Sequence, residues 1–301
     1  MFKFSLRQLE YFAKVAEVKS LAVAARELHI SQPSISTAIT KLETALNVQL
    51  FVRHHAQGVS LTSAGGRMLT EVKALLAHAD DVSQNARGLA EKMRGRLHIG
   101  CFGPIASLYL PALITDFQGQ YPEVELNLYE ADNDTLLAGL AANHYDVAIV
   151  YKLDVPPTLQ LKTLVTLKPY VILPPQHELT AQAQLSLADL AAHPMVLLDL
   201  PRSREYFSTL FTDRNLHPPI SLRSPSFETV RSLVANGSGF SVLVTRPQHN
   251  ACYDGKEVVV REIMDEIPLT EIVLVHPDHV RPTRLHSVFI EHCQEHFSEK
   301  L

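Results

Sequence analysis

The sequence predicts an α/β protein with a mainly helical N-terminal domain, which has a winged helix-turn-helix pattern, and a C-terminal α/β domain of two lobes. Three observations predict this fold class. Apolar residues recur at the helical period through residues 6–46, heptad spacing follows over residues 68–93, and beyond residue 96 short apolar strands alternate with helices. With 301 residues, 46% of them hydrophobic, the chain can form a small and a larger domain with separate cores.

Residues 31–46 predict a helix with an apolar stripe on one side and small polar side chains on the other. Ser31 is a favourable N-cap, and Pro33 is tolerated in the first helical turn. The stripe consists of Ile35, Ile39, Leu42 and Leu46. The polar side chains project outward near the positive end of the helix dipole, as in a helix that recognises DNA bases and phosphates.

Two amphipathic helices are expected before this segment. Ser20 is placed to cap the second helix, and His29 and Ile30 leave only a short turn before Ser31. Their expected core positions are Leu6, Leu9, Phe12, Val15 and Ala16 in the first helix and Leu21, Ala24, Ala25 and Leu28 in the second. This order of three helices is that of a helix-turn-helix motif.

Two short strands are expected after the third helix. Residues 48–53 and 59–62 enclose the loop 54–58 and form a wing that carries Arg53. A small helical domain that binds protein would share the apolar stripes. The wing and the polar face together favour DNA binding instead.

The N-terminal residues resemble the DNA-binding domain of the LysR-type transcriptional regulators, because many positions match at set spacings. The resemblance is carried by Leu6, Arg7, Gln8, Leu9, Phe12, Ser20, Ala24, Ala25, Leu28, Ser31, Gln32, Pro33, Ser34, Leu42, Glu43, Leu50, Phe51, Arg53, Leu61, Thr62 and Gly65. It implies a winged helix-turn-helix domain over residues 1–62 that binds double-stranded DNA at a promoter or operator.

The expected DNA contacts lie at the start of the third helix, along its polar face and on the wing. They are Ser20, Ser31, Gln32, Pro33, Ser34, Ser36, Thr37, Thr40, Lys41 and Arg53. The family often has Arg in place of Thr37, and a shorter, basic wing in place of His54, His55, Ala56 and Gln57. Because Arg is the usual reader of guanine, this face predicts more reliance on A·T contacts, methyl contacts and DNA shape.

Heptad spacing over residues 68–93 predicts a linker helix, at residues 63–94, that pairs with a second copy of the chain. The seam consists of Met68, Val72, Leu75, Ala79, Val82, Ala86, Leu89 and Met93. A helix of about 30 residues is about 45 Å long, and a stripe so narrow and long suits a coiled coil better than a globular core. A single helix lying on its own domain is the alternative.

Beyond residue 96, the order of strands and helices predicts parallel sheets covered on both faces. Strands are expected near 97–99, 124–128, 147–150, 170–173, 195–198, 220–222, 240–244 and 269–276, and helices at 108–117, 136–142, 203–214, 226–236 and 283–298. The last helix is expected to return to the first lobe. The predicted domain at 95–301 therefore has lobe I at 95–166 and 268–301, and lobe II at 167–267.

Ligands in open α/β sheets bind beyond the carboxyl ends of the strands, where helices begin. In this chain such places resemble the effector cleft of the LysR-type regulators, whose second domain has the fold of periplasmic solute-binding proteins. The resemblance implies Phe102, Gly103, Pro104, Ile105, Tyr151, Ser203, Phe227 and Thr229 as effector-binding positions. Helix starts favour a small anion such as a carboxylate, with which Arg202 or Arg204 would pair, whereas Glu228 opposes it.

Two other classes of protein compete with this interpretation. A zinc peptidase is suggested by His292, Glu295 and His296, which fit the H-x-x-E-H pattern, but only five residues follow His296 to supply a further ligand. The histidines continue an apolar stripe, so a packed face is expected, with no catalytic residue, metal or cofactor. A solute-binding protein for transport would need a secretion signal and no DNA-binding domain.

A thiol-based redox regulator is the alternative for what is sensed. Cys101 would be its sensor, although a cysteine at the end of a buried strand is more often a small apolar residue. The other cysteines, Cys252 and Cys293, are distant in sequence, and no C-x-x-C pair occurs. This pattern suits reduced thiols in a cytoplasmic protein.

Charge separates the two parts of the chain. Residues 1–96 contain 13 Lys and Arg against 8 Asp and Glu, whereas the remainder contains 14 against 24. A cationic end on an anionic body suits DNA binding through that end alone. No stretch of about 18 apolar residues occurs, so no membrane association is expected. The resemblance further implies a homotetramer built as a dimer of dimers and contact with RNA polymerase.

Overall fold

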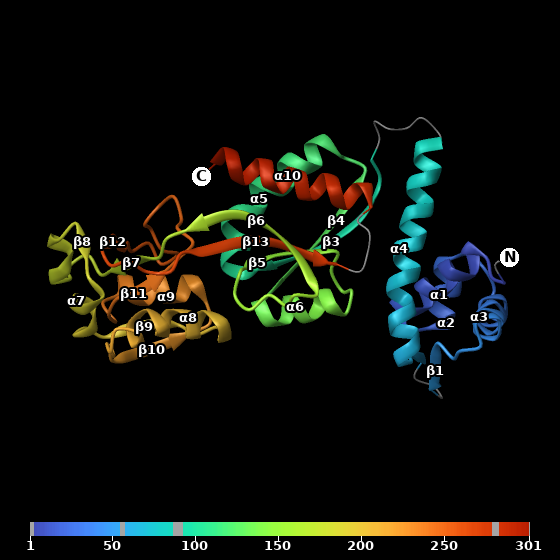
Figure 1. Ribbon diagram of the computed structural model, residues 1–301, viewed down its shortest axis with the longest axis horizontal. Coiled ribbons are helices and arrows are strands. Elements are labelled where there is room, and N and C mark those ends of the chain that lie inside the picture. The colour runs from blue at the N-terminus through green and yellow to red at the C-terminus, as the bar shows by residue number, and fades with distance from the viewer. Residues whose placement is uncertain (1–2, 55–57, 87–92, 279–282, 301) are drawn as a thin grey trace. The chain divides into compact units, whose positions relative to one another are not determined.

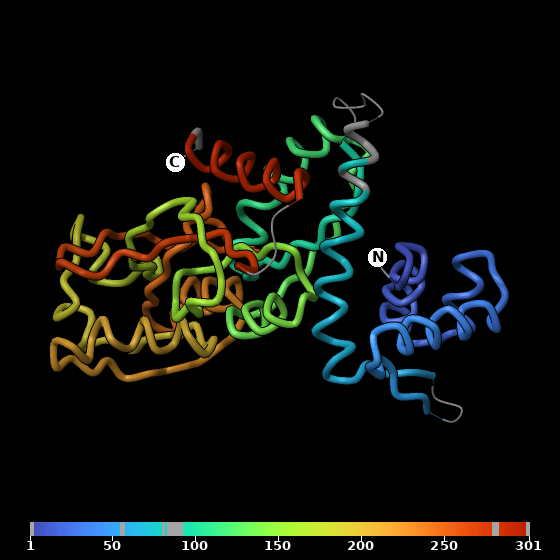
Figure 2. Tube along the Cα trace, turned by 45° about the vertical axis from the view of Figure 1, so that its right-hand side comes forward, coloured from blue at the N-terminus to red at the C-terminus, as the bar shows by residue number. Residues whose placement is uncertain are grey.

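A computed structural model describes residues 3–54, 58–86, 93–278 and 283–300 (Figures 1 and 2). The chain forms two compact units. The first unit contains residues 1–93 and 279–287, and the second contains residues 94–278 and 288–301.

The first unit is a winged helix-turn-helix, as predicted. Its elements are α1 (Leu6–Val18), α2 (Leu21–Glu27), α3 (Gln32–Leu46), β1 (Phe51–His54), β2 (Gly58–Leu61) and α4 (Ser63–Ala86). Ser5, Ser20 and Ser31 cap the first three helices, each by accepting a backbone N–H three residues on. The first strand is shorter than expected, because residues 48–50 precede the paired part of β1, and the second strand begins one residue earlier than expected.

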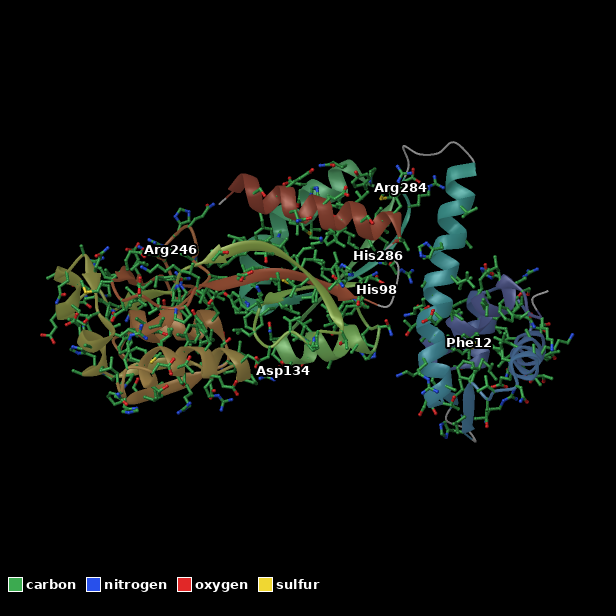
Figure 3. All side chains as sticks on the ribbon, viewed as in Figure 1. Phe12, His98, Asp134, Arg246, Arg284 and His286 are labelled. Carbon is green, nitrogen blue, oxygen red and sulfur yellow. The ribbon has the colours of Figure 1, made fainter. Side chains whose placement is uncertain are left out.

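Apolar faces of the three helices, the wing and α4 enclose the core of this unit. Phe12, Ile35 and Leu42 are fully buried there, and Figure 3 shows Phe12 between the helices. The rings of Phe12 and Phe51 lie 5.3 Å apart, which joins α1 to the wing. The predicted stripe of α3 therefore faces the core and leaves its polar side exposed.

The predicted heptad seam divides into two parts. Met68 and Val72 pack into the core of the first unit, whereas Leu75 and Val82 are 45% and 69% exposed. The described part of α4 reaches Ala86, Leu89 lies outside the described residues, and Met93 is not helical. Among the seam residues whose side chains the structure describes, Leu75 and Val82 are the large apolar ones that are exposed.

Lobe I of the second unit is a five-stranded sheet in the order β4-β3-β5-β13-β6. Its strands are β3 (Gly95–Phe102), β4 (Val124–Ala131), β5 (Val147–Tyr151), β6 (Leu159–Leu167) and β13 (Thr270–Pro277). Strands β4, β3 and β5 are parallel, as predicted, but β13 is antiparallel to both β5 and β6. The parallel pairing predicted for the first three strands is confirmed, and the whole sheet is mixed because β13 returns from lobe II in the opposite direction.

Helices cover both faces of this sheet, with α5 (Gly103–Gln120) and α10 (Arg284–Lys300) on one side and α6 (Asn133–Ala141) on the other (Figure 1). The rings of Phe117 on α5 and Phe289 on α10 lie 5.1 Å apart. His292 of α10 is buried, and its Nε2 lies 3.2 Å from the carbonyl oxygen of Leu113. The last helix therefore returns to lobe I, and its histidine pattern belongs to a packed face, as expected.

Lobe II has a four-stranded mixed sheet in the order β11-β7-β12-β8 and a separate parallel pair, β9 and β10. The strands are β7 (Tyr170–Leu173), β8 (Gln184–Leu185), β9 (Met195–Leu198), β10 (Ile220–Ser224), β11 (Ser241–Leu243) and β12 (Val259–Ile263). The helices are η1 (Glu178–Ala181), α7 (Leu187–Ala191), α8 (Pro201–Thr212) and α9 (Phe227–Ala235). Parallel pairing was the expectation here too, but β7 is antiparallel to both its neighbours, β11 and β12.

Candidate nucleic-acid-binding face and interlobe cleft

The outer side of α3 is an exposed, polar surface at which most predicted DNA contacts meet. Ser36 is half-buried beside this surface, and Ser20 caps α2 rather than lying on α3. The exposed predicted contacts on this surface are Ser31, Gln32, Pro33, Ser34, Thr37, Thr40 and Lys41. The surface carries one cation and several hydroxyl and amide groups, a chemistry suited to phosphates and base edges.

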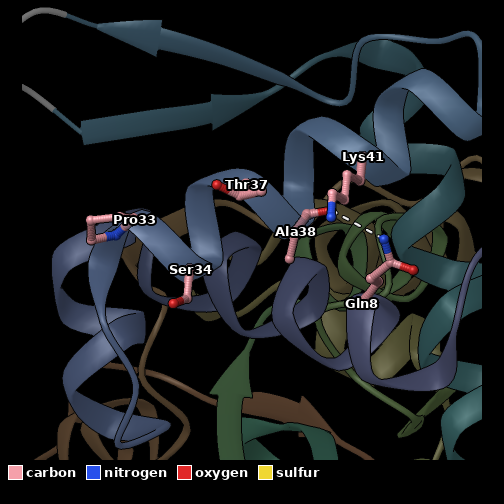
Figure 4. A pocket seen from close by; sticks show the side chains of 6 residues that line it. All are labelled: Gln8, Pro33, Ser34, Thr37, Ala38 and Lys41. Atoms are coloured by element: carbon pink, nitrogen blue, oxygen red, sulfur yellow. Dashed lines mark hydrogen bonds between the residues drawn. The ribbon is translucent and has the colours of Figure 1, made fainter.

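A groove lies between the start of α1 and the outer side of α3 (Figure 4). It is lined by Gln8, Pro33, Ser34, Thr37, Ala38 and Lys41. Gln8 and Ala38 were absent from the predicted contacts. The sequence does carry a signal for Gln8, since Ser5 and Gln8 have the spacing of a capping box and therefore mark a helix start.

Hydroxyl groups on α3 already have local partners. The Oγ atoms of Ser31 and Ser34 are 2.7 Å apart, and Thr40 donates its hydroxyl to the carbonyl oxygen of Ser36 at 3.0 Å. These short-range bonds fix the rotamers of the side chains. Ser31, Ser34 and Thr40 are exposed, as is Gln32, so the helix presents a set of polar groups to solvent.

The wing is joined to α3 through the carboxylate of Glu43. Oε1 of Glu43 accepts the backbone N–H groups of Leu50 and Phe51 at 2.8 and 3.1 Å. Arg53, exposed on β1, donates from Nη2 to Oγ1 of Thr40 at 3.4 Å. The guanidinium therefore lies beside the polar face of α3, while residues 55–57 of the wing lie outside the described residues.

Gly58 is required where the wing passes the end of α1. Its φ is +87°, and a Cβ atom at this position would lie 2.4 Å from the carbonyl oxygen of Lys19. The same carbonyl accepts the N–H of Val59 at 3.0 Å. Any other residue would push the wing away from α1.

In the second unit, a small cavity lies between the two lobes. It is lined by Phe102, Asp132, Asn133 and Asp134 from lobe I and by Leu200, Pro201, Arg202 and Ser203 from lobe II. The cavity volume is about 10 Å³, which is room for about one water molecule. In this structure the cleft is therefore closed.

Arg202 of α8 bridges the lobes. It donates from Nε to Oδ1 of Asp134 at 2.9 Å and from Nη1 to Oδ2 of Asp154 at 2.6 Å. The side-chain hydrogen bond to Asp134, together with the negative charges of Asp134, Asp154 and Glu205, raises the pKa of Arg202. Arg204, the other residue expected to meet an anion, is paired with Asp199 at 2.7 Å within lobe II.

Two helices begin near this cavity without a side-chain cap. The N-caps of α5 and α8 are Phe102 and Leu200, and in these described segments neither makes a side-chain hydrogen bond to its helix. Ser203, in the first turn of α8, is only 4% exposed and lines the cavity. The positive ends of two helix dipoles and a hydroxyl group thus adjoin the same space.

Several expected effector contacts lie around the cavity but do not line it. Gly103, Pro104 and Ile105 form the first turn of α5, and Pro104 and Ile105 are buried. Tyr151 is also buried, which raises the pKa of its phenol, and its ring lies 5.4 Å from that of Phe102. Tyr151 therefore packs behind Phe102, which lines the cavity.

The start of α9 differs from the expectation. Thr229 is exposed, and its backbone N–H donates to Oγ of Ser226 at 3.3 Å. Glu228, expected to oppose an anion, accepts from Nη1 of buried Arg231 at 2.7 Å. Phe227 is half-buried, with the Arg231 guanidinium 6.0 Å from its ring centre. This cluster holds its own loop together, and none of its members lines the cavity.

Three cavity residues of lobe I, Asp132, Asn133 and Asp134, are absent from the predicted effector positions. Buried Asn133 donates from Nδ2 to the carbonyl oxygen of Tyr151 at 3.1 Å, and its Oδ1 accepts the Tyr151 N–H at 3.3 Å. Asp132 caps α6, and the backbone N–H of Thr135 holds the pKa of Asp132 below its usual value. A cap followed by a helix was visible in the sequence, but its approach to α8 was not.

The three cysteine thiols are buried. Cys101 and Cys293 have no exposed surface, and Cys252 is 5% exposed. Burial raises the pKa of Cys101 well above its usual value, with a further contribution from Glu130. Because the thiolate is the reactive form, this environment argues against Cys101 as a redox sensor.

The described residues give no support to a metal site or a membrane span. No three His, Cys, Asp or Glu side chains among them are grouped so as to hold a metal ion. None of the described helices combines the length and apolarity needed to cross a bilayer.

Two family descriptions match the chain. "Bacterial regulatory helix-turn-helix protein, lysR family" matches residues 6–66, and "LysR substrate binding domain" matches residues 90–298.

Individual relatives are similar over almost the whole length. The transcriptional activator protein LysR of Escherichia coli (strain K12) is 28% identical over 291 residues, covering 96% of this chain and 92% of that protein. The structure of HinK, a LysR family transcriptional regulator from Pseudomonas aeruginosa, is 39% identical and covers 97% of this chain and 98% of that one, with a TM-score of 0.65. The PA01 protein from Pseudomonas aeruginosa is 38% identical and covers 97% and 99%, with a TM-score of 0.66.

Proposed function

This chain belongs to the LysR family of transcriptional regulators, which bind DNA and are not enzymes, and from this premise we propose how its residues carry out regulation. The outer side of α3 reads an operator in the major groove, and Arg53 of the wing binds a phosphate. A small anion between the two lobes switches the protein. Two copies pair through α4.

The observation that carries the DNA-binding proposal is the composition of the α3 face. Gln32, Ser34 and Thr37 offer hydrogen bonds to base edges, and positive charge is supplied by Lys41 on α3 and by Arg53 beside Thr40. No Arg occurs on the described outer side of α3. We therefore propose direct readout of A·T pairs and thymine methyl groups, supplemented by DNA shape.

Selection from a random-sequence duplex library tests this proposal. The full-length protein is expected to enrich an interrupted palindrome whose half-sites are separated by about one helical turn, roughly 34 Å. Enrichment of guanine at most half-site positions would contradict the proposed readout.

The proposed dimer contact is the exposed part of the α4 stripe. Leu75 and Val82 are large apolar residues that remain exposed in a single chain. They lie seven residues apart, so they face the same side of the helix. Pairing this side with a second copy would bury both and place two recognition helices on one DNA site; a homotetramer would join two such dimers.

The effector proposal rests on the uncapped starts of α5 and α8 beside Ser203 and Arg202. These groups favour a small carboxylate or another anion. Because the closed cleft has room for about one water molecule, the lobes must separate to admit it. The anion would then replace Asp134 and Asp154 as the partner of Arg202. This exchange would change the orientation of one lobe relative to the other.

Thermal-shift screening of the full-length protein with small carboxylic acids and aromatic metabolites tests the effector proposal. A ligand that binds the folded protein raises its apparent stability, by about 2.7 kcal/mol at a hundredfold excess over Kd. Ser203→Ala should weaken the response, whereas Thr229→Val, outside the cavity, should not. A response lost only in Thr229→Val would move the site to α9.

We further propose that the protein acts in the cytoplasm at a promoter, where contact with RNA polymerase gives its effect on transcription. Footprinting of the selected duplex together with RNA polymerase tests this contact. An extended footprint is expected, and independent footprints would count against it.

A further inference from the structure

Gln8 lies on α1, yet its side chain faces the outer side of α3 (Figure 4). Its Oε1 accepts the backbone N–H of Ser5 at 2.8 Å and the Ser5 hydroxyl at 3.2 Å. A backbone N–H can only donate, so the amide atom that faces it must be the oxygen. The hydrogen-bond network therefore determines which way the Gln8 amide points.

The nitrogen of this amide is consequently directed toward α3. Nε2 lies 3.5 Å from the carbonyl oxygen of Ala38, the long limit of a hydrogen bond. An amide carries two N–H groups, and only one can be directed at Ala38. The groove around Gln8 contains the ammonium group of Lys41 but no carboxylate among its six lining residues.

We propose that Gln8 donates its second N–H to DNA, so that α1 contributes a contact to the recognition surface. This inference rests on the proposed placement of DNA against α3. The acceptor is a DNA oxygen or ring nitrogen, either on a phosphate or on a base edge in the major groove. With its oxygen occupied by Ser5, Gln8 acts as a donor only, and it has few rotamers to lose on binding.

The fold needs only the oxygen of this amide. Gln8→Glu keeps an acceptor for the Ser5 N–H, and a carboxylate is favourable in the first turn of a helix. Gln8→Met removes both the acceptor and the donor without adding charge. Ser5→Ala removes the capping hydroxyl but leaves the Ser5 N–H, which still orients Gln8. The three variants therefore separate helix capping from donation to DNA.

Fluorescence anisotropy on the full-length protein tests the inference. The probes are a duplex selected from a random library by the unsubstituted protein and a scrambled duplex of the same composition. Gln8→Met is expected to bind the selected duplex about tenfold more weakly, and Gln8→Glu at least as weakly because it also repels phosphates. Ser5→Ala is expected to bind normally while melting at a lower temperature.

Both possible acceptors give a distinct pattern. Loss confined to the selected duplex identifies a base edge, and equal loss on both duplexes identifies a phosphate.

The inference is overturned if both Gln8 variants bind like the unsubstituted protein, or if Ser5→Ala loses as much affinity as Gln8→Met. Gln32→Ala distinguishes this inference from the proposed function. If Gln32→Ala loses DNA affinity and neither Gln8 variant does, the proposal that α3 binds DNA stands and only the Gln8 contact is overturned. If all of these variants bind DNA normally, both the Gln8 contact and the proposed α3 interface are overturned.

Discussion

Arg202 of lobe II and Asp134 of lobe I form an ion pair, with Nε and Oδ1 2.9 Å apart. The same guanidinium reaches Asp154, whose φ of +51° lies in the left-handed region that Asp tolerates. One side chain therefore links α8 to two separate segments of the other lobe. The two ion pairs of Arg202 therefore span the cleft between the lobes.

Removing this bridge should loosen the lobes. Asp134→Asn combined with Asp154→Asn is expected to increase the radius of gyration in X-ray scattering and to speed proteolysis of the interlobe segments 168–169 and 264–269. Arg204→Ala is the matched control, because its partner Asp199 lies in the same lobe. Equal effects in the two proteins would show that the bridge does not hold the lobes together.

Substitutions on the DNA-binding face should separate specificity from general affinity. Gln32→Ala is expected to reduce discrimination against mismatched operators by about 1–3 kcal/mol, whereas Arg53→Ala should weaken all duplexes alike and lower the salt slope by about one unit. Binding to selected and scrambled duplexes at several salt concentrations measures both effects. If Gln32→Ala loses equal affinity for the two duplexes, Gln32 does not contact a base edge.

Charge at the exposed seam of α4 should separate the two copies. Placing Asp at both Leu75 and Val82 would bury unpaired charge and cost association about 3–5 kcal/mol. Light scattering is expected to show a smaller particle, and operator affinity should fall because two half-sites are no longer engaged together. Lys73→Asp, on the same helix but off the seam, is the control for mass. An unchanged mass in the doubly substituted protein would contradict the proposal that two copies pair through this seam.

The stability of lobe II should depend on the protonation of His177. Burial, together with nearby His193, holds the pKa of His177 below its usual 6.5. The unfolded chain therefore takes up this proton more readily, so the contribution to stability is complete above about pH 6.5 and decreases as the pH falls below it. The neutral Nδ1 accepts the Leu179 N–H at 3.3 Å, a bond that protonation removes.

His177→Asn keeps an acceptor at this cap and removes the titration. Melting temperatures between pH 5.5 and 7.5 should fall less steeply in this variant than in the unsubstituted protein. Parallel curves would assign the pH dependence to other histidines.

The three thiols should be inert in the folded protein. Burial raises the pKa of Cys101, Cys252 and Cys293 above the usual value. At pH 7.5 a thiol reagent is expected to label all three only after unfolding, and hydrogen peroxide should leave operator binding unchanged. Rapid labelling of Cys101 in the folded state would restore the redox alternative.

Local patterns in the sequence determined the first unit and most helices. Caps such as Ser20 and Ser31, and apolar residues at the helical period, act within a few residues of each other. The polar face of α3 could therefore be predicted residue by residue. Gln8 could not, because its place in the groove depends on how α1 packs against α3.

Strand pairing and the cleft were decided by the tertiary structure. Strands β6, β8 and β12 were missed, and β13 pairs antiparallel with β5, because alternating apolar residues show that a strand exists but not which neighbour it joins. Arg202 lies 68 residues from Asp134 and 48 from Asp154. The residues near Arg202 in the sequence do not show whether its guanidinium is available to an anion or already paired with carboxylates of the other lobe. Only the packing of α8 against α6 decides between these two states.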